Sequence, residues 1–125
     1  MSILFKVLGD IFRPSSSRPA QSSGDAGLRV FIGYDSRQSV AYNVLQHSLY
    51  TRSSRPVSIT PLVLDTLPME RSGLTPFTYS RFLVPWLCNY SGVGLFLDLD
   101  MLVRGDIREL FDLADSKYAV QVVKS

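Results

Sequence analysis

Two aspartates separated by one residue, Asp98 and Asp100, come directly after the apolar run Leu95-Phe96-Leu97. Because side chains alternate along a strand, both carboxylates would point to one side of the sheet and Leu99 to the other. Carboxylate oxygens are ligands that Mg²⁺ and Mn²⁺ prefer, and a bound diphosphate would supply further ligands to the same ion. The pattern predicts a divalent-metal site at Asp98 and Asp100. In the structural alternative, Asp98 caps the following turn and Asp100 pairs with Arg104.

A second polar cluster, at positions 34–37, follows another apolar run. Ligands of open α/β sheets bind outside the carboxyl ends of the strands, so we expect this cluster and the aspartate pair at the same edge. Tyr34, Asp35 and Arg37 are therefore candidate substrate-binding residues. Asp35 also has a structural alternative, because Gln38 three residues later completes the pattern of a helix-capping box.

The sheet that would position both clusters is predicted from hydrophobic runs. Short apolar runs at 28–33 and 93–97 are typical of strands buried on both faces. A β-branched run at 57–64 contains Pro61 and therefore favours an edge strand. A last strand is expected at 118–123.

Helices are predicted between these strands. Helical spacing of apolar residues predicts one helix from Ser39 onward and a second from Thr75 to about Tyr90, kinked at Pro85. Asp106 and Glu109 form a possible capping box for a short helix. The alternation of strands and helices predicts an α/β fold with an open, mainly parallel sheet flanked by helices.

The segment before the first of these strands has a different character. Positions 1–13 carry apolar residues at helical spacing, which predicts an amphipathic helix that docks on this chain or a second copy, or that makes weak membrane contact. Positions 14–27 are rich in Ser, Pro, Gly and Ala, as linkers are. We expect the folded domain at 28–125.

Composition narrows the classes of function. The chain has 125 residues, 46% of them hydrophobic, and a net charge of +2, so one domain is expected and no nucleic-acid partner. The single cysteine, Cys88, has apolar neighbours and is expected to be a buried thiol. His47 is expected at the surface or in packing. No apolar stretch is long enough to span a membrane, and a cytoplasmic protein is expected.

The sequence resembles the family-eight glycosyltransferases, the group that includes glycogenin and bacterial lipopolysaccharide glycosyltransferases, over about 28–123. The resemblance is carried by two blocks and a downstream segment, which read Thr78-Tyr79-Ser80-Arg81-Phe82, Leu95-Phe96-Leu97-Asp98-Leu99-Asp100-Met101-Leu102-Val103, and Gly105-Asp106-Ile107 through Leu110-Phe111.

The resemblance implies a GT-A-like (Rossmann-like) fold, a UDP-sugar donor, Mn²⁺ or Mg²⁺ as cofactor, and transfer with retention of configuration. It places Asp98 near the donor ribose and the metal, Asp100 on the metal, and Arg81 at the donor sugar or diphosphate. Asp35 would hold the uracil and ribose end, and Tyr34 would substitute for an aromatic residue that the family usually has where this chain has Gln38. The acceptor, whether saccharide, lipid-linked glycan or protein, is not specified.

Three readings of function remain open. Enzymes of that family continue beyond the Asp-x-Asp segment to a further metal ligand and an acceptor pocket, so we expect the donor-binding part of a hexosyltransferase, apparently truncated. The second reading is a non-catalytic sugar-nucleotide-binding module. The third is a haloacid-dehalogenase-type phosphatase, in which Asp98 would be the phosphoryl nucleophile and Asp100 the acid/base.

Overall fold

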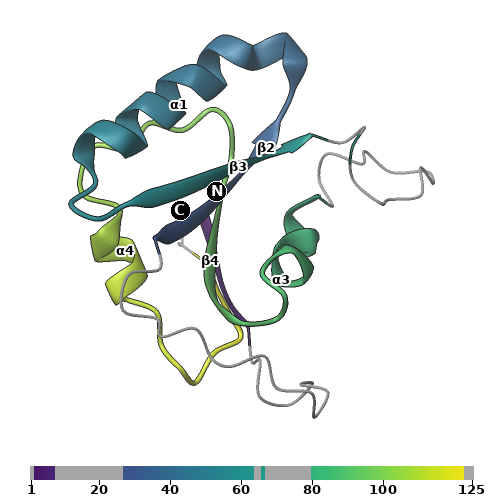
Figure 1. The fold of residues 1–125 in the computed structure, drawn as a ribbon, viewed down its shortest axis with the longest axis vertical. Coiled ribbons are helices and arrows are strands. Elements are labelled where there is room, and N and C mark those ends of the chain that lie inside the picture. Colours follow the sequence, from purple (N-terminus) through teal and green to yellow (C-terminus); the bar gives the residue numbers. More distant parts are fainter. Residues whose placement is uncertain (1, 8–26, 64–65, 67–79, 123–125) are drawn as a thin grey trace.

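The computed structural model describes residues 2–7, 27–63, 66 and 80–122, which form a five-stranded sheet with helices on both faces (Figure 1). The strands are β1 (Ser2–Val7), β2 (Leu28–Tyr34), β3 (Val57–Val63), β4 (Gly92–Leu97) and β5 (Val120–Val122). The α-helices are α1 (Ser39–Arg52), α3 (Val84–Leu87) and α4 (Arg108–Asp112), and the 3₁₀ helices η2 (Ser36–Gln38) and η4 (Ser80–Leu83) precede α1 and α3.

The centre of the sheet is parallel. The strand order is β3-β2-β4-β1-β5, and β2 pairs in parallel with both β3 and β4. β1 lies antiparallel between β4 and β5. The expected α/β class with a small open sheet, parallel at its centre and flanked by helices, is confirmed, and this arrangement is compatible with Rossmann-like folds.

Two hydrophobic clusters cover opposite faces of this sheet. On one face, Val30, Ile32, Leu95 and Leu97 pack with Leu45 and Leu49 of α1, and Ile107 beside α4 joins them. On the other face, Phe31 and Phe96 pack with Val84 and Cys88 of α3 and its end. The alternation follows the two-residue period of the strands. Figure 1 shows α1 and α3 on the two sides of the sheet.

The edge strand β3 matches the expectation from Pro61, which lies within it and lacks a backbone donor. In the register of β2 and β3, Pro61 lies opposite Ile32. β2 and β4 also lie where the apolar runs predicted them, with ends that differ by a residue. β5 is shorter than expected, at Val120–Val122.

The expected N-terminal helix is wrong for residues 2–7, which form β1. Its backbone pairs with β4 from Ser2 opposite Leu97 to Val7 opposite Gly92. A short isolated helix is marginal in water, whereas a strand placed between β4 and β5 joins the hydrogen-bond ladders of two neighbours. The remainder of the expected helix and nearly all of the expected linker lie outside the described residues.

The second expected helix is broken into two pieces where it is described. Ser80–Leu83 is a 3₁₀ helix, and α3 begins at Val84 with Pro85 in its first turn. A proline is tolerated in the first turn because the amide it lacks has no intrahelical partner there, so the chain begins a new helix at this point instead of kinking a long one. The expected start at Thr75 lies outside the described residues.

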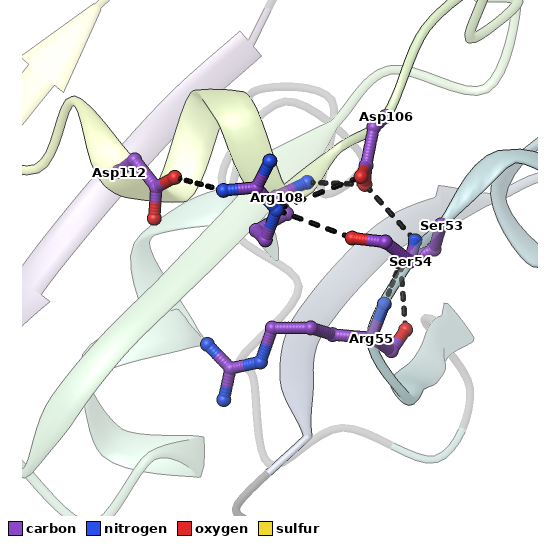
Figure 2. Close-up of polar contacts among 6 residues, drawn as sticks. All are labelled: Ser53, Ser54, Arg55, Asp106, Arg108 and Asp112. Atoms are coloured by element: carbon purple, nitrogen blue, oxygen red, sulfur yellow. Dashed lines mark hydrogen bonds and ion pairs between the residues drawn. The ribbon is translucent and has the colours of Figure 1, made fainter.

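The expected capping box at the start of α4 is replaced by a longer-range arrangement. The Asp106 carboxylate accepts hydrogen bonds from the Arg108 amide at 3.0 Å and from the Ser54 amide at 3.2 Å. Arg108 in turn donates to Ser54 Oγ at 3.1 Å and to Asp112 at 2.6 Å (Figure 2). Asp106 therefore links α4 to the turn between α1 and β3. In the described ranges, no helix has the length and apolarity needed to cross a membrane.

Candidate functional site

The order of the strands creates a switch in chain direction between β2 and β4. From β2 the chain passes through α1 to β3 on one side, and the chain then returns past β2 to β4 on its other side. Two crossovers of one handedness that run in opposite directions place their helices on opposite faces, as α1 and α3 are placed here. Ligands of open α/β sheets bind at the carboxyl ends of the strands beside such a switch.

Asp98 is the first residue after β4 at this position. The last paired residues of the two strands are Ile32 and Leu97, so Asp98 leaves the sheet beside Gly33. Its carboxylate lies 3.7 Å from Nη2 of Arg81, and the two side chains are 25% and 14% exposed. The Arg81 guanidinium carbon also lies 5.2 Å from the centroid of the Phe96 ring. A partly buried cation therefore lies at the end of β4, close to both an anion and an aromatic face.

Asp100 and Leu99 diverge after the end of the strand. The strand ends at Leu97, as expected, and the chain enters a turn at Leu99, so the alternation of a strand does not extend over Asp98 and Asp100. Leu99 is buried in the cluster on the α1 face, whereas Asp100 is exposed. Asp98 pairs with Arg81. The expected alternative pair of Asp100 with Arg104 is not found among the ion pairs of the described residues.

Asp98 and Asp100 offer too few protein ligands to hold a metal ion by themselves. Within the described ranges, no group of three or more His, Cys, Asp and Glu side chains could hold a metal ion. Mg²⁺, however, is commonly bound by one or two carboxylates together with substrate phosphates and water. The two aspartates therefore do not form a closed metal site, and an ion held by them would need further ligands from a bound diphosphate.

Tyr34, at the end of β2, contributes an aromatic surface on the α1 side of the switch. Its ring packs edge-to-face against Tyr42 of α1, with centroids 5.2 Å apart and planes at 87°. Burial is the main cause that raises the pKa of Tyr42, so its hydroxyl is neutral at physiological pH. The pair holds the Tyr34 ring at the edge where Asp98 leaves the sheet.

Asp35 and Arg37 are paired with each other. Asp35 accepts from the Arg37 amide at 2.9 Å as the cap of η2, and from Arg37 Nε and Nη2 at 3.0 and 2.8 Å. The side-chain hydrogen bond from Arg37 is the main cause that lowers the pKa of Asp35. Asp35 therefore caps a helix, as its structural alternative predicted. Its side chain accepts from the Arg37 amide, and not from Gln38 as a capping box would require.

The remaining sequence-based expectations concern single residues. His47 is exposed on α1, as expected for a surface residue. Cys88 is 3% exposed, as expected for a buried thiol, and burial raises its pKa.

Two residues at the site were not anticipated. Phe96 lies under Arg81, and Tyr42 supports Tyr34. Phe96 could have been identified from the sequence, because the two-residue period of a strand places it on the same face as Asp98. No local sequence pattern predicts that Tyr42 contacts Tyr34.

Comparison with known proteins gives one clear relative. The chain is 45% identical, over 111 residues, to Protein CDI of Arabidopsis thaliana. The alignment covers 82% of this chain and 43% of the relative, so the chain spans less than half of that protein's length. No family model matches the sequence. No solved structure matches it either.

These findings correct the assignment to the family-eight glycosyltransferases. The similarity found is to Protein CDI, and no family model, of glycosyltransferases or of any other group, matches. The block that contains the two aspartates is the end of strand β4 followed by polar residues, and the block that contains Arg81 lies partly in the 3₁₀ helix η4. Any α/β sheet with carboxylates at a strand terminus can produce such blocks, so the blocks were too short to identify a family.

Proposed function

We propose that this chain binds a nucleoside diphosphate sugar together with Mn²⁺ or Mg²⁺ at the carboxyl ends of β2 and β4. The observation that carries the proposal is the position of Asp98, which follows β4 at the switch point and faces Arg81 at 3.7 Å. Asp98 and Asp100 would hold the cation. Arg81 would bind diphosphate oxygens, for which a guanidinium offers a planar set of donors.

The nucleoside would lie on the β2 side of the same edge. Tyr34 is partly exposed there and held by Tyr42, so its ring is available to a base. Asp35 and Arg37 would contact the ribose side, with Arg37 keeping the Asp35 carboxylate charged and oriented. UDP is the proposed nucleotide, and a GT-A-like version of the α/β fold is the finer architecture that accords with this layout.

The proposed activity is transfer of a hexosyl group, with the chain as donor-binding part. A divalent cation draws charge from the leaving diphosphate, and this chemistry requires no nucleophile from the protein. The proposed location is the cytoplasm.

The second candidate function is a binding module without turnover. It is favoured by the lack of a third metal-ligating side chain beside the two aspartates among the described residues.

Thermal unfolding with UDP and Mn²⁺ tests the binding site. A ligand at 100 times its Kd adds about 2.7 kcal/mol to the free energy of unfolding, which corresponds to a rise in Tm of roughly 10 °C for a domain of this size. We expect this rise in the wild type with both ligands present, and its loss in Asp100→Asn. Asp112→Asn is the matched control, because Asp112 is an exposed carboxylate on α4. A wild type whose Tm shows no metal-dependent rise would refute the site.

Turnover separates the alternatives that binding leaves open. Release of UDP from a UDP-hexose would identify a transferase or a hydrolase, and binding without release would identify a module. Release of phosphate from an aryl phosphate, lost in Asp98→Asn, would support the phosphatase reading and overturn the transferase.

A further inference from the structure

The position of Arg81 suggests more than a simple contact with the diphosphate. Its Nη2 lies 3.7 Å from Asp98 Oδ1, which is an ion pair but is longer than a charge-assisted hydrogen bond. The guanidinium also lies over the Phe96 ring, at 5.2 Å from the centroid. Phe96 is 1% exposed and fixed in the core, so this second contact does not depend on Asp98.

A cation bound by Asp98 would share that carboxylate with Arg81, which lies 3.7 Å from it. Two cations beside one partly buried carboxylate repel each other, and the side chains of Arg81 and Asp98 are only 14% and 25% exposed, so solvent screens them incompletely. The Phe96 ring would keep the guanidinium at the site when it leaves Asp98. A diphosphate on the same ion would give Arg81 a new anionic partner.

We propose that Arg81 competes with the divalent cation for Asp98 and moves to the diphosphate when the nucleotide binds, which makes the cation and the nucleotide bind cooperatively. This inference rests on the proposed function. Without nucleotide, Arg81 opposes the cation. With nucleotide, Arg81 bridges to the phosphates and the opposition is relieved. By linkage, the cation must raise the affinity for nucleotide by the same factor as the nucleotide raises that for the cation.

Calorimetric titration of Mn²⁺, alone and with saturating UDP, tests the coupling. In the wild type we expect UDP to raise the affinity for Mn²⁺ by about 5- to 150-fold, the usual range for coupled sites. In Arg81→Met we expect tighter binding of Mn²⁺ alone than in the wild type, and a smaller gain from UDP. Competition therefore predicts that the affinity for Mn²⁺ alone rises while the gain from UDP falls. Simple loss of the site would lower the affinity for Mn²⁺ in both conditions.

A charge-matched control is provided by Arg52→Met. Arg52 is exposed in the last turn of α1, which lies toward the amino ends of the strands, so this variant removes one positive charge away from the site. It should bind Mn²⁺ and UDP as the wild type does. If Arg81→Met does not fold, as judged by circular dichroism, Arg81→Gln removes the charge with a polar side chain and carries the same expected signs.

The possible failures are distinguishable. If the wild type binds neither Mn²⁺ nor UDP, the proposed function is wrong. If the wild type binds both but the variant that lacks the Arg81 charge binds Mn²⁺ alone as weakly as the wild type or more weakly, Arg81 does not compete with the cation and the inference is wrong. Equal coupling in the wild type and that variant would also overturn it.

Discussion

The side chain of Arg29 in β2 donates from Nε to the carbonyl oxygen of Val93 in β4 at 3.2 Å. The same guanidinium donates to the carbonyl oxygens of Cys88, at 3.4 Å, and Ser91. Cys88 and Ser91 lie in the turn that joins α3 to β4, where Asn89 and Tyr90 have φ of 51° and 53°. One arginine therefore holds a turn in which two consecutive residues have positive φ, a conformation that is uncommon for a residue such as tyrosine.

Replacement of Arg29 by methionine should destabilise the fold by about 1–3 kcal/mol, because carbonyl groups of the turn lose charged donors. Urea unfolding followed by circular dichroism measures the effect. Arg52→Met, at an exposed position of α1, should change stability by less than about 0.5 kcal/mol. Equal stabilities of the two variants would show that the turn does not depend on Arg29.

A methyl group at Gly94 has no space. A Cβ there would lie 2.9 Å from Cys88 Sγ and 3.0 Å from Val84 Cγ1, at the interface between β4 and α3. Gly94→Ala should therefore cost about 1–3 kcal/mol by overpacking. Gly105→Ala is the control, since a Cβ at Gly105 meets nothing within 4 Å.

A double-mutant cycle locates the origin of that cost. If the Cys88 sulfur is the obstacle, Gly94→Ala should cost less in a Cys88→Ala background than in the wild type. Additive effects of the two substitutions would show that the Cys88 sulfur is not the obstacle.

The contacts of Asp106 should make stability depend on pH in the acid range. Hydrogen bonds from Ser54 and from the Arg108 amide lower the pKa of Asp106 in the folded chain. Its stabilisation is therefore complete above the ordinary aspartate pKa of about 3.9 and is lost as pH falls through the lower folded value. The difference in urea midpoint between the wild type and Asp106→Asn should be constant from neutral pH to about pH 5 and shrink below about pH 4. A difference that grows on acidification would contradict this assignment.

The Cys88 thiol should react slowly with alkylating reagents in the folded chain. It is 3% exposed, and burial raises its pKa, so both access and the thiolate fraction are low. Reaction should require local opening of α3, and Gly94→Ala should accelerate it. Alkylation followed by mass spectrometry, with and without urea, gives the two rates, and equal rates would refute the burial.

The parts of the fold that the sequence predicted are those with local signals. The apolar runs at 28–33 and 93–97 identified the two central strands, and Pro61 identified an edge strand. Residues 2–7 were predicted as part of a helix because the apolar residues of positions 1–13 fall at helical spacing. Their partner strand β4 lies far away in the sequence. Local patterns cannot identify such a partner.

At the site, the sequence indicated where polar groups gather but not how they pair. Asp98 and Asp100 were recognised from their place after a strand, whereas the ion pair of Asp98 with Arg81 depends on how η4 packs over β4. The bond between Asp35 and Arg37 shows the reverse case, in which a cap expected from a spacing of three is made with a residue two positions away.

The antiparallel placement of β1 affects how proteins and tags can be joined to this chain. Ser2 lies opposite Leu97, the residue before Asp98, and Val122 of β5 lies opposite Ile3. A polypeptide fused ahead of Ser2 or after Val122 would therefore leave the sheet at the edge that carries Asp98. Affinity tags at either position should be cleaved before nucleotide titrations, since bulky fusions would obstruct the approach of ligands.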